Sequence, residues 1–446
     1  MASGARKVSK GGSVFRVVGG NFLEMFDFMV YGFYASAIAT AVFPSDNEYV
    51  SLMLSFVTFG MGFLMRPLGA IILGGYIDKH GRRKGLILSL GLVSIGVLLI
   101  ALTPGYATIG LAAPILVLLG RLLQGFSAGA ESSGVSVYLA EIATPGKRGF
   151  YVSWQSGSQQ VSVIFAAVIG VVLHFTLADA QMQAWGWRVP FLIGCLIIPF
   201  LFWIRATLTE TEDFEARTKQ RRPKFREVYA TLVQSWRIVL TAIMLVTLTS
   251  VMFYLITTYT PTFGERELGL SQTDSFVVTL CVGFSNLFWI PVMGALSDRL
   301  GRLRVLTASA VLVAVTAFPL MLWLTAAPSF PRMLAVLLAL SFMYGGYQGV
   351  MVVTLTEIMP AKVRASGFAL AYSLAQAIFG GFTPAIATWL INVTGNKAMP
   401  GVWLSCAALV ALVGAYAVHR SKVLTRADDS FVPTASTADQ AAERVG

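Results

Sequence analysis

The sequence has little charge for its length and few of the residues on which soluble enzymes and metalloproteins rely. Of its 446 residues, only 12% are charged, three are cysteine and three are histidine. A soluble domain carries about a quarter charged residues, so this composition excludes an ordinary soluble protein. Cys195, Cys281 and Cys406 lie far apart within apolar runs, which argues against a disulfide framework and a zinc motif. Apolar residues are abundant instead: 56% are hydrophobic and the mean hydropathy is +0.72.

The motifs of several enzyme classes are also missing. The sequence contains no phosphate-binding GxxxxGK[ST] loop, no HExxH and no CxxC. The longest polar stretch, about 208–237, is too short to form a nucleotide-binding or signalling domain. These absences argue against an enzyme, an ATP-driven pump and a membrane sensor, and they indicate neither a cofactor nor a metal.

Twelve apolar stretches alternate with short polar segments. A transmembrane helix needs about 20 mainly apolar residues. Glu24 and Asp27 interrupt the first stretch, which argues against a cleaved signal peptide. We therefore predict an all-α membrane protein with twelve transmembrane helices, at about 16–41, 51–76, 85–104, 112–142, 150–176, 188–207, 238–263, 273–297, 305–326, 332–358, 366–391 and 399–419.

The basic residues are concentrated on one side of the predicted membrane. With the N-terminus inside, 27 of the 33 Lys and Arg residues fall in cytoplasmic segments and four fall in outer loops. Cytoplasmic loops of membrane proteins carry an excess of Lys and Arg, so this bias predicts that both ends of the chain are cytoplasmic. It also explains the net charge of +11 as a result of membrane topology, so the lipid bilayer is expected as a partner and a nucleic acid is not.

An internal repeat divides the chain into two halves. GGYIDKHGRRK (74–84) and GALSDRLGRLR (294–304) share Gly, Asp, Gly and Arg at an offset of 220 residues, and EIATPGKRG (141–149) is echoed by EIMPAKVRASG (357–367). We predict two six-helix bundles around a central cavity. The predicted parts are a cytoplasmic N-terminus at 1–15, the bundles at 16–207 and 238–420, a cytoplasmic linker at 208–237 and a disordered tail at 421–446.

Both repeated motifs resemble those of the major facilitator superfamily. The GxxxDxxGR loop follows spans two and eight, and a Glu…Arg pair follows spans four and ten. The resemblance covers all twelve spans and implies two parallel halves that rock around the cavity. Alternatively, the motif charges only follow the positive-inside rule. If the resemblance holds, they gate the cytoplasmic side: Asp78, Arg82, Glu141, Arg148, Asp298, Arg302, Glu357 and Arg364.

Longer stretches are similar to one family within that superfamily, the metabolite–proton symporters. They include GNFLEMFDFMVYGFYA (20–35), GRLLQGFSAGAE (120–131), YVSWQSGSQQ (151–160) and WGWRVPF (185–191). Symporters of citrate, tricarballylate, dicarboxylates, shikimate and osmolytes belong to this family, and the long runs are most similar to the bacterial citrate–proton and tricarballylate–proton symporters. Ser132 and Ser133 depart from the pattern of small apolar residues or glycines expected there. The resemblance implies a bacterial inner-membrane protein.

Five ionisable residues fall inside the predicted spans, all of them in the first half. Charges within a membrane are costly and usually functional. At the repeat offset, the corresponding positions of the second half are uncharged, so the scaffold is duplicated but its buried charge is not. This asymmetry favours a role in transport over a structural role for these residues: Glu24, Asp27, Arg66, Arg121 and Glu131.

An arginine suits a carboxylate substrate because its planar guanidinium group donates two parallel hydrogen bonds and stays charged. Arg121 is our first candidate for binding a substrate carboxylate, and the alternative is a permanent ion pair with Asp27 or Glu131. Arg66, next to the helix-breaking Pro67, is the second candidate, with a structural role as its alternative. Two arginines favour a polyanion over a zwitterionic osmolyte.

Three carboxyl groups, Glu131, Asp27 and Glu24, are candidates for proton coupling. Burial favours the neutral form of a carboxyl group, and a nearby arginine favours the charged form. An anion that captures the arginine leaves its acidic partner freer to take up a proton, which couples substrate to proton movement. The histidines lie near the ends of spans, so a central histidine switch is not expected.

Neutral polar residues on the cavity-facing sides of several spans could hydrogen-bond the substrate. Packing between helices is an equal alternative for each of them. Our candidates are Asn21, Tyr31, Gln124, Gln155, Gln159, Tyr347, Gln348 and Gln376.

These observations predict a proton-coupled secondary active symporter that imports a tricarboxylate, citrate or tricarballylate, by alternating access. The alternatives are proton-coupled symport of a dicarboxylate such as 2-oxoglutarate, of shikimate, or of an osmolyte such as proline or betaine. We expect a monomer that needs no cofactor.

Overall fold

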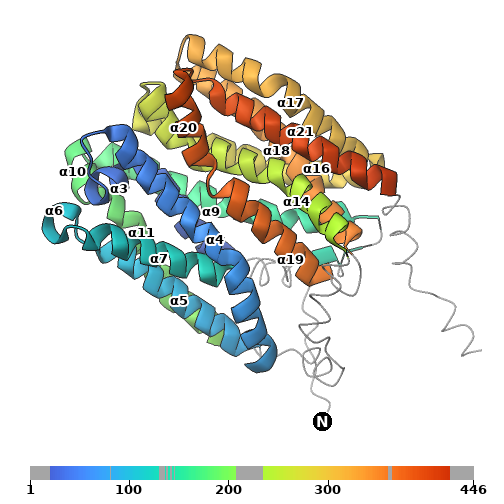
Figure 1. Ribbon diagram of the computed structural model, residues 1–446, viewed down its shortest axis with the longest axis horizontal. Coiled ribbons are helices and arrows are strands. Elements are labelled where there is room, and N and C mark those ends of the chain that lie inside the picture. The colour runs from blue at the N-terminus through green and yellow to red at the C-terminus, as the bar shows by residue number, and fades with distance from the viewer. Residues whose placement is uncertain are drawn as a thin grey trace, which may run out of the picture.

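The computed structural model is all-helical and describes residues 21–80, 82–129, 136, 139–140, 143–144, 146–206, 235–359 and 364–421. Most of its helices run side by side along one direction (Figure 1). We call residues 21–206 the first part and residues 235–421 the second part. Figure 1 shows the first part, blue to green, and the second part, yellow to red, largely on opposite sides of the molecule.

The helices of the first part are α2 (Asn21–Phe33), α3 (Ala35–Val42), α4 (Glu48–His80), α5 (Arg82–Leu102), α6 (Tyr106–Ile109), α7 (Ala112–Ala128), α9 (Arg148–Thr176), α10 (Asp179–Ala184), the 3-10 turn η1 (Gly186–Arg188) and α11 (Val189–Ala206). Those of the second part are α14 (Trp236–Phe253), the π-helical turn η2 (Tyr254–Thr258), α15 (Thr260–Thr262), the π-helical turn η3 (Phe263–Glu267), α16 (Gln272–Leu300), α17 (Arg302–Ala326), α18 (Phe330–Ile358), α19 (Arg364–Ala375), the π-helical turn η5 (Gln376–Gly380), α20 (Thr383–Thr394) and α21 (Met399–Ser421).

Many of these helices are long and apolar enough to cross a membrane. Eight in the described residues meet this condition, and nine do if α2 and α3, which bend by 67° at their junction, form one span. Large apolar side chains such as Leu196, Val315 and Phe175 are exposed, as expected for surfaces that face lipid. The prediction of an all-helical membrane protein is confirmed.

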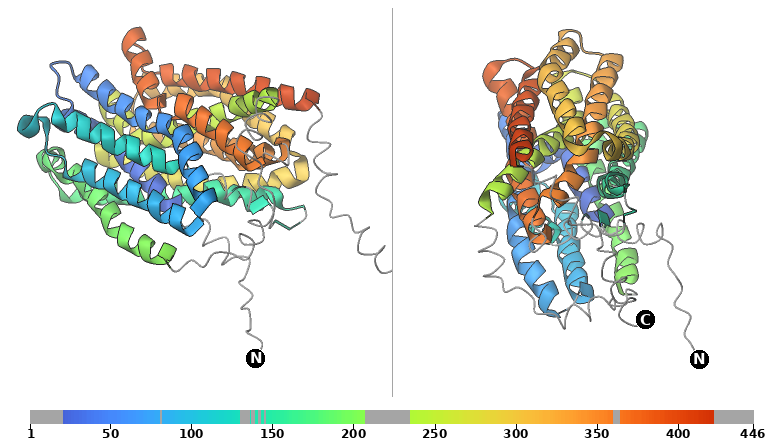
Figure 2. Two further views of the ribbon diagram at one scale, coloured as in Figure 1. Left: turned by 60° about the horizontal axis from the view of Figure 1, so that its bottom comes forward. Right: turned by 90° about the vertical axis from the view of Figure 1, so that its right-hand side faces the viewer.

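The two parts meet along α9 and α16, which pack against each other from end to end. Near one end, a Cβ atom added to Gly149 would lie 2.3 Å from the carbonyl oxygen of Gly294, so only glycine permits this approach. Near the other end, a Cβ atom added to Gly170 would lie 2.3 Å from the ring of Phe276. Figure 2 shows the bundle from two further sides, and both helices keep apolar side chains exposed on an outer face, such as Phe175 of α9 and Phe288 of α16.

Breaks in helical regularity were not expected from the sequence. The predicted first span is bent between α2 and α3, and the predicted seventh and eleventh spans contain the π-helical turns η2 and η5. Pro261 and Pro384 follow these two turns. A proline lacks the N–H group of a regular helix and clashes with the preceding turn, which favours such local widening.

Candidate functional site

The two intramembrane arginines lie close together because α4 and α7 touch backbone to backbone. A Cβ atom added to Gly125 of α7 would lie 1.6 Å from a carbonyl oxygen of α4, and one added to Gly129 would lie 2.0 Å from another. Small residues at this spacing let membrane helices approach closely. Both guanidinium groups consequently reach the ring of Phe28 on α2, with the Cζ atom of Arg66 4.5 Å and that of Arg121 4.4 Å from its centre.

Arg121 is fully buried and is held by neutral groups. Its Nη1 donates to Gln124 Oε1 at 2.8 Å, and its Nη2 donates to the Phe59 carbonyl oxygen at 3.3 Å. The guanidinium also lies over the rings of Tyr31 and Phe59, at 4.7 and 4.9 Å. Among the described residues, neither Arg121 Nε nor Gln124 Nε2 has a hydrogen-bond partner, and Arg121 forms no ion pair with Asp27.

Arg66 is also buried, and its charge faces a carboxyl group. Its Nη2 lies 3.5 Å from Oε1 of Glu24, and its guanidinium lies 4.4 Å from the centre of the Phe63 ring. The Nε and Nη2 atoms form no hydrogen bond within the described part of the chain. Both arginines therefore hold unused N–H donors in the interior.

Asp27 is a buried carboxyl group without a hydrogen bond. Its side chain is 1% exposed, and neither of its oxygens has a hydrogen-bond partner among the residues described. The charged groups that act on it are Arg121 and Glu24. α11 approaches it at Gly194, where an added Cβ atom would lie 3.0 Å from Asp27 Oδ1, so this neighbour offers no side-chain donor.

The second part faces the arginines with neutral polar and aromatic groups. The Tyr254 hydroxyl donates to Gln376 Oε1 at 3.0 Å, and each of these residues begins a π-helical turn. The ring of Tyr254 lies 5.2 Å from that of Phe63, across the boundary between the parts. Gln348 accepts a hydrogen bond from Thr249 and donates to Ser156 Oγ of α9 at 2.7 Å.

Other candidate binding residues make contacts within the protein. The Tyr347 hydroxyl donates to the Leu245 carbonyl oxygen at 2.7 Å, and that of Tyr31 donates to the Ser55 carbonyl oxygen at 3.4 Å. Gln155 Oε1 accepts a hydrogen bond from Ser156, and Gln159 is buried on the same helix. Their roles in binding stay predictions.

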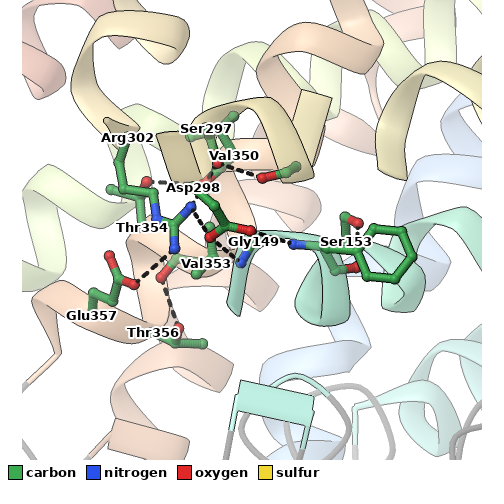
Figure 3. A network of polar contacts seen from close by, with 12 residues as sticks. Gly149, Ser153, Ser297, Asp298, Arg302, Val350, Val353, Thr354, Thr356 and Glu357 are labelled. Carbon is green, nitrogen blue, oxygen red and sulfur yellow. Dashed lines mark hydrogen bonds and ion pairs between the residues drawn. The ribbon is translucent and has the colours of Figure 1, made fainter. Parts of the chain in front are cut away.

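A charged network joins the two parts at the end of the molecule predicted to be cytoplasmic (Figure 3). Asp298 accepts hydrogen bonds from the backbone N–H groups of Gly149 at 2.9 Å and Phe150 at 3.1 Å, at the start of α9. Arg302 lies 2.7 Å from Asp298 and 3.5 Å from Glu357. Asp298 therefore caps a helix that belongs to the other part of the chain.

Contacts also join the two parts at the opposite end. Arg266 of η3 pairs with Glu48 at the start of α4, at 2.7 Å, and donates from Nε to Ser36 Oγ at 3.0 Å. His174 at the end of α9 contacts Gln272 at the start of α16. The buried arginines thus lie between contacts at both ends.

Comparison with known proteins assigns this arrangement to a family. The family model described as sugar (and other) transporter matches residues 13–427. The chain belongs to the sugar (and other) transporter family. Two citrate-proton symporters are similar to this transporter. That of Salmonella typhi is 58% identical over 90% of this chain and 92% of its own length. That of Klebsiella pneumoniae is 57% identical over 92% of this chain and 93% of its own length.

The fold of the transporter is that of the major facilitator superfamily. The proton:xylose symporter XylE of E. coli superposes with a TM-score of 0.74 over 92% of this chain and 96% of its own, at 18% sequence identity. The resemblance to metabolite–proton symporters, deduced from the motifs, is confirmed by the two relatives above.

Several predicted residues lie outside what the structure describes. Glu131 and Glu141 are outside the described residues, as are the side chains of Asn21, Asp78, Arg82 and Arg364. Arg148 lies at the first turn of α9, next to the two N–H groups that Asp298 caps. The proton-coupling role of Glu131 and the gating roles of the first-half motif stay predictions.

Sequence reasoning missed the aromatic residues around the arginines. Phe28, Phe59 and Phe63 supply four of the five ring contacts that the described residues make to the two guanidinium groups. The spacing of Phe59 and Phe63, four residues apart and preceding Arg66 on one helix, was a visible signal. In a chain with 30 phenylalanines, that signal does not stand out from ordinary lipid-facing residues.

Proposed function

We propose that this transporter imports citrate, or the similar tricarboxylate tricarballylate, together with protons. The observation that carries the proposal is the pair of buried arginines beside Phe28, whose Nε atoms and Arg66 Nη2 have no hydrogen-bond partner in the described chain. Carboxylates bind the N–H edge of a guanidinium group through short, charge-assisted hydrogen bonds. An anion with several carboxylates can satisfy both arginines at once. The names of the two relatives, citrate-proton symporters at 57–58% identity, support the same substrate.

Proton coupling follows from the acids beside these arginines. Glu24 pairs with Arg66, and Asp27 lies within the electrostatic influence of Arg121. When a substrate carboxylate engages an arginine, that arginine stabilises the neighbouring carboxylate less, and a buried acid then favours its neutral form. Substrate and proton binding therefore reinforce each other. Glu131 remains a third proton candidate.

We also propose the predicted topology of twelve spans in two six-helix halves, at 16–207 and 238–420, with both ends of the chain on the cytoplasmic side of a bacterial inner membrane. Eight described spans, or nine with α2 and α3 counted as one, support it. Three shorter apolar helices, Ile87–Leu102, Ala112–Ala128 and Gly186–Pro199, lie within the predicted third, fourth and sixth spans or overlap them. The contacts at both ends suit a closed conformation in which substrate is occluded.

Uptake by proteoliposomes tests the function directly. We expect labelled citrate to accumulate when the outside is more acidic, and to equilibrate only slowly without a gradient. Tricarballylate should compete strongly, 2-oxoglutarate weakly, and betaine not at all, because a zwitterion does not need two arginines. Accumulation that ignores the proton gradient, or competition by betaine, would contradict the proposal.

The network around Asp298 serves, in this proposal, as a lock on the cytoplasmic side. The first N–H groups of a helix carry partial positive charge and lack partners within the helix, so a carboxylate there is favourable. This carboxylate comes from the other half, and the contact must therefore break when the halves separate. By the repeat, we propose that Asp78 caps the start of α19 in the same way.

Replacing Asp298 by asparagine should favour the inward-open state. Asparagine keeps the shape but loses the charge that binds Arg302 and the start of α9. Hydrogen bonds to charged groups contribute about 1.5–3 kcal/mol, and roughly 1.4 kcal/mol is a tenfold shift in population. Thiol labelling of a cysteine placed at Ser153 should become faster by about tenfold or more, while turnover falls.

Arg299→Gln is the matched control for this experiment. Arg299 lies one residue after Asp298, is exposed, and forms no ion pair in the described chain. Labelling at position 153 should stay at the unsubstituted rate in this variant. Equal labelling of both variants would show that Asp298 does not hold the cytoplasmic side closed.

A further inference from the structure

Aromatic rings surround both buried guanidinium groups. Arg66 lies over Phe28 and Phe63, at 4.5 and 4.4 Å from the ring centres. Arg121 lies over Phe28, Tyr31 and Phe59, at 4.4, 4.7 and 4.9 Å. All four rings are buried, and together we call them the aromatic cage.

The aromatic cage holds the arginines in a way that leaves their donors available. A guanidinium cation that lies over the face of an aromatic ring is attracted electrostatically by the ring. Its N–H donors point outward in the guanidinium plane, along the edge that a carboxylate recognises. An acidic residue in place of a ring would occupy those donors. Arg121, which makes three ring contacts and no ion pair with Asp27, shows the consequence most plainly, because its Nε keeps no partner among the described residues.

Phe28 is the ring that both arginines share. Because each Cζ atom lies within 4.5 Å of its centre, the two Cζ atoms are at most about 9 Å apart. Two cations at this distance repel each other in a poorly solvated interior. The shared ring attracts both, so it opposes their separation and fixes where each one points.

We propose that Phe28 is a specificity-determining residue, which sets the spacing of Arg66 and Arg121 and thereby selects anions with two or more carboxylates over monocarboxylates. The inference rests on the proposed function, because it assumes that these arginines bind the substrate. Phe28 itself is a positioning residue that acts through the two arginines. A monocarboxylate needs only one arginine and gains little from their spacing.

Equilibrium binding to the purified full-length transporter in lipid nanodiscs tests this inference. The probes are labelled citrate, with tricarballylate and lactate as competitors. In Phe28→Leu, which keeps an apolar side chain but removes the ring, we expect the Kd for citrate and for tricarballylate to rise about tenfold or more. The inhibition constant of lactate should change less than threefold, so discrimination between polyanion and monocarboxylate falls.

Two variants separate this role from simple packing. Phe28→Tyr restores a ring and should bind citrate as the unsubstituted protein does. Phe56→Leu is the matched control, since Phe56 is fully buried and packs on Tyr259, at 5.7 Å between ring centres, rather than on an arginine in the described chain. Its citrate Kd should stay within about twofold of the unsubstituted value.

A double-variant cycle identifies the partner through which Phe28 acts. In an Arg66→Lys background one planar partner of the ring is gone, so Phe28→Leu should weaken citrate binding much less than it does alone. A packing role gives additive effects instead. Additive effects, or an unchanged citrate Kd in Phe28→Leu, would overturn this inference alone. Absence of citrate binding by the unsubstituted protein would overturn the proposed function, and this inference with it.

Discussion

Lysine in place of Arg121 should severely weaken citrate uptake while the protein still inserts and folds. Arg121 donates to Gln124 and to the Phe59 carbonyl group, lies over aromatic rings and still keeps a free Nε donor in the described chain. Lysine keeps the positive charge, but its single ammonium group cannot make all of these contacts at the same time. Charge-assisted hydrogen bonds contribute about 1.5–3 kcal/mol each. We therefore expect the KM for citrate to rise by roughly 100-fold, measured as initial uptake into proteoliposomes containing equal amounts of protein.

Arg188→Lys is the matched control for this loss. Arg188 also stacks on an aromatic ring, that of Trp187, and donates to the carbonyl oxygens of Ala184 and Thr103, but it lies at the end of the molecule opposite the Asp298 network. Its replacement should leave the KM within about twofold of the unsubstituted value. Unchanged citrate affinity in Arg121→Lys would remove Arg121 from the binding site.

Arg121 illustrates how much of the site could be predicted from the sequence. An arginine within an apolar span is costly, so its presence alone marked Arg121 and Arg66 as functional candidates. The repeat strengthened this prediction, because the corresponding positions hold Asn286 and Ser341. In the structure these two neutral residues contact each other, with Ser341 Oγ 2.7 Å from Asn286 Oδ1. The second half therefore keeps a polar contact where the first half keeps two charges.

The surroundings of the arginines could not be predicted in the same way. Helical periodicity shows which residues share a face of one helix, but it does not show which faces meet. Phe28 lies on α2, whereas Phe59 and Phe63 lie on α4, and they gather around the arginines only through the packing of α2, α4 and α7. The π-helical turns at Tyr254 and Gln376 likewise depend on tertiary contacts.

The contacts of Asp298 show a third limit of prediction from the sequence. The motif of Asp298 and Arg302 was visible because it repeats, and its resemblance to a known motif predicted a gate on the cytoplasmic side. The partners of Asp298 across the boundary could not be predicted, because they are backbone N–H groups of Gly149 and Phe150. Backbone donors have no signature in the sequence, so the contact between the halves became visible only in the structure.

Asparagine in place of Asp27 should uncouple citrate movement from the proton gradient. The carboxyl group is buried, has no hydrogen bond among the described residues, and lies close to Gly194. A carboxyl group in such surroundings strongly favours its neutral form unless an arginine compensates its charge. Asparagine imitates that neutral form permanently. We therefore expect citrate binding to persist and to lose much of its pH dependence.

The free energy needed to move citrate inward makes the expected loss of accumulation large. A trivalent anion that moves inward against 100 mV loses roughly 7 kcal/mol, and at least three protons per citrate are needed to offset it. A variant that cannot release a proton inside should exchange labelled for unlabelled citrate across the membrane at a near-normal rate but should not accumulate it. Counterflow and gradient-driven uptake, measured on the same vesicles, separate these two activities. Glu24→Gln and Glu131→Gln complete the comparison. If Asp27→Asn accumulates citrate normally, the proton role belongs to whichever of these two variants fails to accumulate it.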